Sequence, residues 1–196
     1  KSRVPVLPGS RIQCNAASLG FECIKINMSL VIIICGQAGV GKTTLSEKLS
    51  KRLNVFCLHK DSIKERLFDL LEGDSLEESK RAGMISMELL FHLAEEAIRN
   101  GVDVMVESPF NHPSNPGVFE RWKCEYDIDM KIIVCELKDE TEHRRRFSER
   151  VASGTRHHSH RDFDRNWEPG SFDYSVMPDS KLFLDMSQSH EKNIDD

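Results

Sequence analysis

The sequence predicts an α/β fold built on a parallel sheet, and three observations support this class. Helix-like and strand-like patterns alternate along the 196 residues of the chain, as they do when helices cover a sheet. The length suits one domain with a sizeable core. A glycine-rich segment, 36–44, lies between a strand-like run and a helix-like run, which is the order of a phosphate-binding P-loop.

The first elements alternate between strand and helix. Residues 30–35 are apolar at every position, as expected for a strand that is covered on both faces. A helix is expected over 42–53, directly after the glycines. A short apolar strand over 55–58 leads into a second helix over 62–71, which ends near Gly73.

A long helix ending at Arg99 is expected next. Ser75 and Glu78 have the spacing of a capping box, which marks the first turn of a helix. Apolar residues then recur every four positions at 85, 89 and 93, with 90, 94 and 98 beside them. An Asn-Gly pair follows Arg99 and ends the helix.

The second half of the chain continues the alternation. The remaining expected elements are a strand over 102–106, a helix over 115–123, a strand over 130–135, a helix over 139–152 and a strand over 182–185. Asn115 and Pro116 supply a cap and a first-turn proline, and Asp139 and Glu142 form a second capping-box pattern. The polar stretch 153–168 is expected to be a loop or lid. Five strands linked by helices imply a parallel sheet that binds ligands at the carboxyl ends of its strands.

Both ends of the chain are expected to differ from the domain between them, which spans 28–187. Residues 1–27 have weak periodicity and prolines near the start, as in a leader or a poorly ordered extension. The alternative is a segment that packs on the domain. Residues 188–196 are expected to be a polar tail.

Composition narrows the function classes. The net charge of −5 argues against binding nucleic acid through bulk charge, although a local basic patch stays open. Six cysteines without a C-x-x-C pair indicate thiols in a reducing compartment, so we expect a cytoplasmic protein. No apolar run is long enough to span a membrane.

The glycine-rich segment matches the pattern G-x-x-x-x-G-K-[ST] and predicts a nucleotide site. The residues expected to surround the phosphates are Gly36, Gln37, Ala38, Gly39, Val40, Gly41, Lys42, Thr43 and Thr44. Glycines let successive N–H groups point into one concavity, and the helix dipole adds to the field. Lys42 would bridge the β- and γ-phosphates of ATP, Thr43 would ligate Mg²⁺, and Thr44 would contact the α-phosphate. The alternative is a glycine-rich turn with a chance lysine.

Asp61 follows the second strand, so its carboxylate is expected to face the mouth of the P-loop. A carboxylate there can accept the proton of an attacking hydroxyl, orient that hydroxyl, or hold magnesium through water. The alternative is a helix N-cap. Lys64 lies one turn further on and would bind an anionic group of the substrate. Its alternative is a solvated surface lysine.

Glu107 closes the third strand, in the position of a Walker-B carboxylate. It would hold Mg²⁺ opposite Thr43, at the edge of the substrate site. The alternative is a strand-end carboxylate in a salt bridge. The loop that follows, 108–112, is a candidate for substrate contacts through Phe110, which packing would explain equally well.

Arginines cluster on the helix over 139–152 and in the polar stretch after it. Arg146 and Arg150 lie one turn apart and are candidate catalytic residues, because guanidinium groups would neutralise charge on the transferred phosphoryl group. Arg156 is a candidate nucleotide contact. The alternative for the set is a solvated basic face. The histidines of 157–160 lack an adjacent cysteine, so exposed or phosphate-contacting roles are favoured over zinc.

Together these motifs resemble the small P-loop kinases. The resemblance rests on the P-loop, the His59-Lys60-Asp61-x-x-Lys64 turn, the Val-Glu-Ser-Pro-Phe run, and Arg146-x-x-x-Arg150 leading into the Arg-His-x-x-His stretch of 156–160. It covers about 28–187. The chain is similar to polynucleotide kinase, gluconate kinase, chloramphenicol phosphotransferase and zeta toxin, and above all to AAA-domain ATP-binding kinases.

The resemblance implies a three-layer P-loop NTPase fold with strand order 2-3-1-4-5 and an arginine-bearing lid. It implies ATP with Mg²⁺ as phosphoryl donor and Asp61 as the carboxylate that activates the acceptor hydroxyl. Two departures stand out: Glu107 replaces the commoner aspartate, and the substrate loops carry no assignable signature.

Three functions follow as hypotheses. The first is an ATP-dependent kinase that phosphorylates a hydroxyl of a small molecule. The second is a nucleic-acid 5′-hydroxyl kinase, which shares the Asp-x-x-Lys turn. The third is a nucleotide-binding module without transferase activity. A GTPase switch is disfavoured, because the sequence lacks an Asn-Lys-x-Asp motif. The acceptor and the oligomeric state are left open.

Overall fold

The computed structural model describes residues 28–154, 156–161, 172–178, 180–188 and 190–195. The expected leader, 1–27, and part of the polar stretch lie outside the described residues. The elements are β1 (Ser29–Gly36), α1 (Lys42–Leu53), β2 (Phe56–His59), α2 (Lys60–Leu70), α3 (Leu76–Arg99), β3 (Val104–Glu107), α4 (Asn115–Glu125), β4 (Ile128–Glu136), α5 (Glu140–Ala152), the short 3₁₀ helices η1 (His158–His160) and η3 (Tyr174–Val176), β5 (Lys181–Asp185) and α6 (His190–Asp195).

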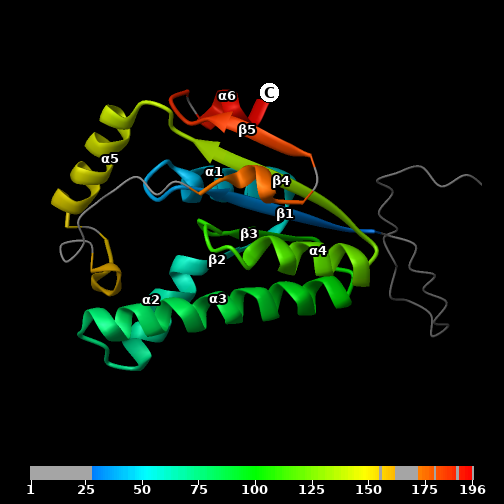
Figure 1. Ribbon diagram of the computed structural model, residues 1–196, viewed down its shortest axis with the longest axis horizontal. Helices are drawn as coiled ribbons and strands as arrows, with labels where there is room; N and C mark the ends of the chain where they lie inside the picture. The colour runs from blue at the N-terminus through cyan, green and yellow to red at the C-terminus, as the bar shows by residue number, and fades with distance from the viewer. Residues whose placement is uncertain (1–27, 155, 162–171, 179, 189, 196) are drawn as a thin grey trace, which may run out of the picture.

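The five strands form one parallel sheet in the order β2-β3-β1-β4-β5 (Figure 1). This confirms both the α/β class and the strand order. Glu107 at the end of β3 is in register with Ile34 of β1 and with His59 of β2. The carboxyl ends of the three strands therefore meet at one edge, where the glycine loop begins.

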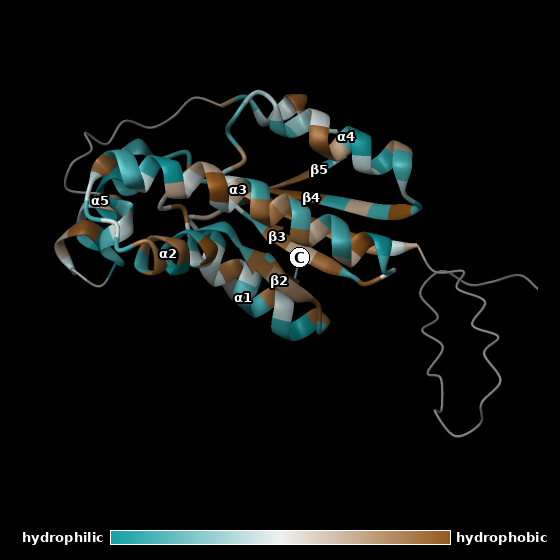
Figure 2. Ribbon diagram, turned by 90° about the horizontal axis from the view of Figure 1, so that it is seen from below, coloured by the Kyte–Doolittle hydropathy of each residue, from teal (hydrophilic) through white to brown (hydrophobic). Residues whose placement is uncertain are grey.

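Helices cover both faces of the sheet, because the central strand is apolar on both sides. Val31 and Ile33 of β1 pack in a core with α3 and α4. The alternate residues Ile32 and Ile34 pack in a second core with Leu45 of α1. Figure 2 shows hydrophobic colour along the strands between these helices, so the layers are helix, sheet and helix.

The long helix α3 begins as expected and buries one of its two expected apolar stripes, the one at 90, 94 and 98. The Ser75 side chain accepts a hydrogen bond from Glu78 N–H, and Glu78 accepts one from Ser75 N–H, which completes the capping box. Leu89 and Leu93 are exposed, however. The buried stripe is Ala82, Ser86, Leu90, Ala94 and Ile98. The four-residue period was correct, but small residues mark the face that approaches the sheet.

Two helices differ from the sequence expectation at their ends. Helix α2 starts at Lys60, directly after β2 and two residues before the expected position, with His59 as its N-cap residue. Asp61 therefore lies inside the first turn and is not the N-cap. Helix α6 lies within the expected polar tail, where Asn193 is buried and donates to the Asp185 carbonyl at 3.2 Å. Within the described residues, no helix is long and apolar enough to cross a membrane.

Candidate active site

The glycine loop between β1 and α1 has a backbone that requires glycine. Gly36, Gly39 and Gly41 have φ angles of 131°, 86° and 105°, in the region that side chains rarely adopt. A Cβ atom on Gly36 would lie 2.2 Å from the carbonyl oxygen of Cys135 on β4. The loop can therefore pass close to the neighbouring strand only because position 36 has no side chain.

The loop presents its polar groups at the start of α1. Lys42 is buried, and its ammonium group donates to the Gln37 carbonyl at 2.7 Å. Burial lowers the pKa of Lys42, while Glu107 acts in the opposite direction. Thr43 and Thr44 are exposed in the first turn of α1, where the helix dipole is positive. This is the arrangement of a P-loop around a phosphate group.

Glu107 meets the P-loop across the sheet, as the sequence predicted. Its carboxylate accepts a hydrogen bond from the Thr43 hydroxyl at 3.2 Å and lies 4.0 Å from the Lys42 ammonium. It also contacts His59 Nδ1 at 3.2 Å. Hydrogen bonds with Cys57 and Glu107 raise the pKa of His59 to about 10. A hydroxyl and a carboxylate are oxygen ligands of the kind Mg²⁺ prefers, so this pair fits a magnesium ion.

Asp61 lies on the first turn of α2 and lines a cavity together with Gln37 and Ala38 of the P-loop. Burial raises the pKa of Asp61, but the surrounding cations, led by Lys60, outweigh it and hold the pKa at about 2. The carboxylate is therefore ionised at neutral pH. It can accept a hydrogen bond from a hydroxyl group in the cavity and orient it.

Residues 156–161, the described part of the expected lid, contact α2 through two polar side chains. Arg156 donates to the Asp61 carboxylate at 3.0 Å and to His160 Nδ1 at 2.9 Å. Because a guanidinium group has no acceptor, His160 Nδ1 is the acceptor, and its Nε2–H donates to Glu65 at 2.7 Å. Burial lowers the pKa of His160, which agrees with this neutral form.

Lys64 is buried and is not the solvated lysine of the alternative reading. Its ammonium group donates to the Ser79 hydroxyl at 2.9 Å, and that hydroxyl donates to the Ser159 carbonyl at 2.6 Å. This chain joins α2, α3 and the lid. Lys64 also lines the cavity near Asp61, so it lies where the predicted anionic group would bind.

The cavity has a volume of about 1140 Å³ and extends from the P-loop between α2, α3 and α4. Lys60, Lys80, Arg121 and Arg156 contribute positive charge to its wall, and Met87 and Phe91 contribute apolar surface. Its size exceeds that of typical pockets for small ligands, roughly 300–1,000 Å³. It therefore has room for an acceptor beside the end of a nucleotide.

Comparison with known proteins identifies the domain. The sequence profile of the AAA domain family (AAA_33) matches residues 31–166, a range that contains the P-loop, Asp61, Glu107 and Arg156. The chain belongs to this family. None of the curated proteins compared with the chain matches it.

Solved structures share the fold of this AAA domain. A candidate kinase from Chloroflexus aurantiacus is 24% identical with a TM-score of 0.74, covering 86% of this chain and 96% of its own. The APS kinase CysC of Mycobacterium tuberculosis, in complex with AMPPNP and APS, is 16% identical with a TM-score of 0.58, covering 86% and 94%. A sugar kinase from Janibacter sp. is 16% identical with a TM-score of 0.52, covering 86% and 91%. At these identities the similarity shows the fold.

Three expected site residues of the AAA domain do not line the cavity. Arg146 donates to Glu142 at 2.7 Å and to the Met186 carbonyl at 2.9 Å, so it joins α5 to the end of β5. Arg150 lies over the Phe147 ring, 5.1 Å from its centroid. The one-turn spacing was correct, but the shared face of α5 points to these contacts and neither arginine lines the cavity.

Phe110 is the third of these residues. It is fully buried in an aromatic cluster with Phe91 and Phe119, at centroid distances of 6.0 and 5.2 Å. Phe110 is therefore a packing residue, the second of the two interpretations given above. The ring that lines the cavity is Phe91.

His143 on α5 is a P-loop contact that sequence reasoning missed. Its Nε2 lies 2.6 Å from the Ala38 carbonyl and, as that oxygen only accepts, His143 is the donor. The ring also packs against Gly39, where a Cβ atom would lie 3.6 Å from Nε2. His143 and Phe147 lie one turn apart on α5 and both face the cavity. That spacing was the available signal.

Proposed function

We propose that this protein is a magnesium-dependent kinase that transfers the γ-phosphoryl group of ATP to a hydroxyl group of a small molecule. One observation carries the proposal: the Asp61 carboxylate and the P-loop residues Gln37 and Ala38 line the same cavity. A donor phosphate at the P-loop and an acceptor hydroxyl in the cavity can therefore lie next to each other. The kinases among the structural neighbours support this reading.

Each group has a physical role in the transfer. Backbone N–H groups of the P-loop and the Lys42 ammonium bind the phosphates and stabilise the charge that develops on them. Thr43 and Glu107 would hold Mg²⁺, which would neutralise phosphate charge. Asp61 orients the acceptor hydroxyl toward the γ-phosphorus. The new bond forms between the acceptor oxygen and that phosphorus, the bond to the β-phosphate oxygen breaks, and ADP leaves.

The pKa of Asp61 defines its role further. A carboxylate whose pKa is about 2 is a weak base, so orientation of the hydroxyl is its main contribution. The proton of the hydroxyl leaves late, when bond formation has made the oxygen acidic, and it passes to the Asp61 carboxylate and from there to water. Arg156 donates a hydrogen bond to the Asp61 carboxylate and adds positive charge next to the transferred phosphoryl group.

The test is a metabolite screen that measures ADP release with ATP and Mg²⁺. One arm contains small hydroxyl compounds, a second contains a 5′-hydroxyl oligonucleotide, and a third lacks an acceptor. The proposal predicts acceptor-dependent ADP release and a phosphorylated product in the first arm. Release in the second arm alone favours the nucleic-acid kinase. Nucleotide binding without transfer in any arm favours the binding module.

A further inference from the structure

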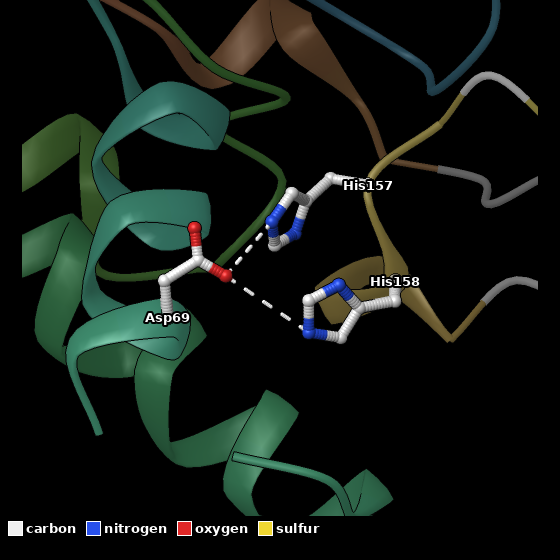
Figure 3. A group of neighbouring side chains, drawn as sticks. All are labelled: Asp69, His157 and His158. Carbon is white, nitrogen blue, oxygen red and sulfur yellow. Dashed lines mark ion pairs between the residues drawn. The ribbon is translucent and has the colours of Figure 1, made fainter. Parts of the chain in front are cut away.

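A group of three metal-binding side chains lies between α2 and the lid, outside the proposed kinase site (Figure 3). Asp69 comes from the last turn of α2, and His157 and His158 come from the start of η1. His157 Nε2 lies 3.0 Å from Asp69 Oδ1, and His158 Nε2 lies 3.9 Å from the same oxygen. Segments almost ninety residues apart thus direct three ligand atoms to one point.

The spacing of these atoms fits a bound zinc ion. Zinc binds imidazole nitrogen and carboxylate oxygen at about 2.0–2.2 Å in tetrahedral geometry, which separates neighbouring ligand atoms by roughly 3.4 Å. The two nitrogen–oxygen distances of 3.0 and 3.9 Å lie on either side of this value. All three ligand atoms lie within 4.8 Å of one another. Small side-chain rotations therefore complete the geometry.

Other contacts orient the two rings beside Asp69. His157 Nδ1 lies 2.9 Å from the Ser159 hydroxyl and accepts from Ser159 N–H at 3.2 Å, so Nε2 is the nitrogen directed at Asp69. Ser159 is itself fully buried. The His158 ring packs edge-on against the buried Phe68 ring at 5.2 Å. Such supporting contacts orient the histidine ligands of metal sites.

We propose that Asp69, His157 and His158 form a zinc site with three protein ligands and water in the fourth position. When zinc binds His157 Nε2, the ring proton moves from Nε2 to Nδ1, which then donates a hydrogen bond to the Ser159 hydroxyl and gives up the bond it accepts from the Ser159 N–H. Imidazole ligands select zinc over magnesium, so the site differs in chemistry from the Thr43–Glu107 pair. The missing signal in the sequence was Asp69, which lies 88 residues before His157.

A zinc ion at this site would cross-link residues 156–161 to α2. Residues 156–161 carry Arg156 and His160, which contact Asp61 and Glu65 on the same helix. Zinc bound to Asp69 would add a second attachment point for this segment, about two helical turns beyond Asp61 on α2. Zinc therefore stabilises the lid conformation in which Arg156 lies on Asp61.

Metal titration of untagged protein tests the site without relying on kinase activity. Calorimetry should show one equivalent of zinc, and Asp69→Asn, His157→Gln and His158→Gln should each weaken its binding by at least about tenfold. His92→Gln, an exposed histidine on α3, is the control and should bind zinc like the wild type. Unchanged affinity in the three site variants would overturn the proposal.

Cobalt(II) distinguishes this site from binding at the cysteines. The cobalt form should show the absorption of nitrogen and oxygen ligands without a thiolate charge-transfer band, and the site variants should lose it. A thiolate band that persists in His157→Gln would place the metal elsewhere. In hydrogen exchange, zinc should slow the amides of 156–161 in the wild type and leave those of Asp69→Asn unchanged. If zinc slowed hydrogen exchange equally in both proteins, zinc would not link residues 156–161 to α2 through Asp69.

Discussion

The guanidinium group of Arg156 lies 3.0 Å from the carboxylate of Asp61 and donates to it. The contact joins the lid to the residue that we expect to orient the acceptor hydroxyl. It also helps to keep Asp61 ionised, as its pKa of about 2 indicates. An acceptor in the cavity therefore meets a charged carboxylate whose orientation is already fixed from the lid side.

Asp61→Asn should lower kcat by at least about a hundredfold and change ATP affinity little. The amide retains the shape of the side chain but removes the charge that orients the hydroxyl. Turnover and nucleotide titration measure the two effects separately. Asp127→Asn, an exposed carboxylate before β4, is the matched control. Normal turnover in Asp61→Asn would assign Asp61 a structural role only.

Lys42→Met should lower ATP turnover at least about a hundredfold, because the ammonium stabilises charge on the transferred phosphoryl group. Methionine has a similar length and is accepted by a buried position, so folding should persist. Lys51→Met, an exposed lysine in the last turn of α1, is the control. ADP release and ATP affinity are measured on both. If Lys42→Met keeps both, the nucleotide binds elsewhere.

Gly36→Ala should destabilise the protein by at least about 2 kcal/mol, because the added methyl group would lie 2.2 Å from the Cys135 carbonyl oxygen. The φ angle of 131° adds backbone strain. Gly117→Ala is the control, since a Cβ there meets nothing within 4 Å in helix α4. It should gain about 0.5–1 kcal/mol. Urea unfolding measures both, and equal stabilities would contradict the close approach of the strands.

Glu95→Gln should cost about 2 kcal/mol at pH 7 and less at pH 4. The side chain is 12% exposed and accepts hydrogen bonds from Arg121, Tyr126 and Trp122, joining α3 to α4. The bonds from Arg121 are the main cause of a pKa near 2, against 4.5 ordinarily. The stabilisation is therefore complete above the unfolded pKa and disappears as the pH falls toward 2.

Urea unfolding of Glu95→Gln at the two pH values checks this sign. Glu96→Gln removes an exposed carboxylate that pairs with Arg99, and it should change stability by well under 1 kcal/mol at either pH. A cost for Glu95→Gln that does not depend on pH would show that its charge is not what the network stabilises.

The sequence was informative where backbone conformation and strand ends determine the site. The glycines at 36 and 41, Lys42 and Thr43 define the P-loop by residue type alone. Glu107 could be placed because the carboxyl ends of parallel strands share an edge. Such positions depend on local sequence and sheet topology, and both were correct.

Helix faces were harder to predict. Leu89 and Leu93 have the expected period but are exposed, since the close approach of α3 to the sheet selects Ala82, Ser86 and Ala94. Arg146 bonds to Glu142 and to the Met186 carbonyl, Arg150 lies over the Phe147 ring, and neither arginine lines the cavity. Long-range partners decide these orientations, and a single sequence does not contain them. The same reason hid His143 beside Ala38 and Asp69 beside the lid histidines.

The bond from the Lys42 ammonium to the Gln37 carbonyl closes the glycine loop between the first residue of α1 and the second residue of the loop. A phosphate group that binds here would replace the Gln37 carbonyl as the acceptor of the Lys42 ammonium. A loop closed by its own hydrogen bond has less conformational entropy to lose when a ligand binds.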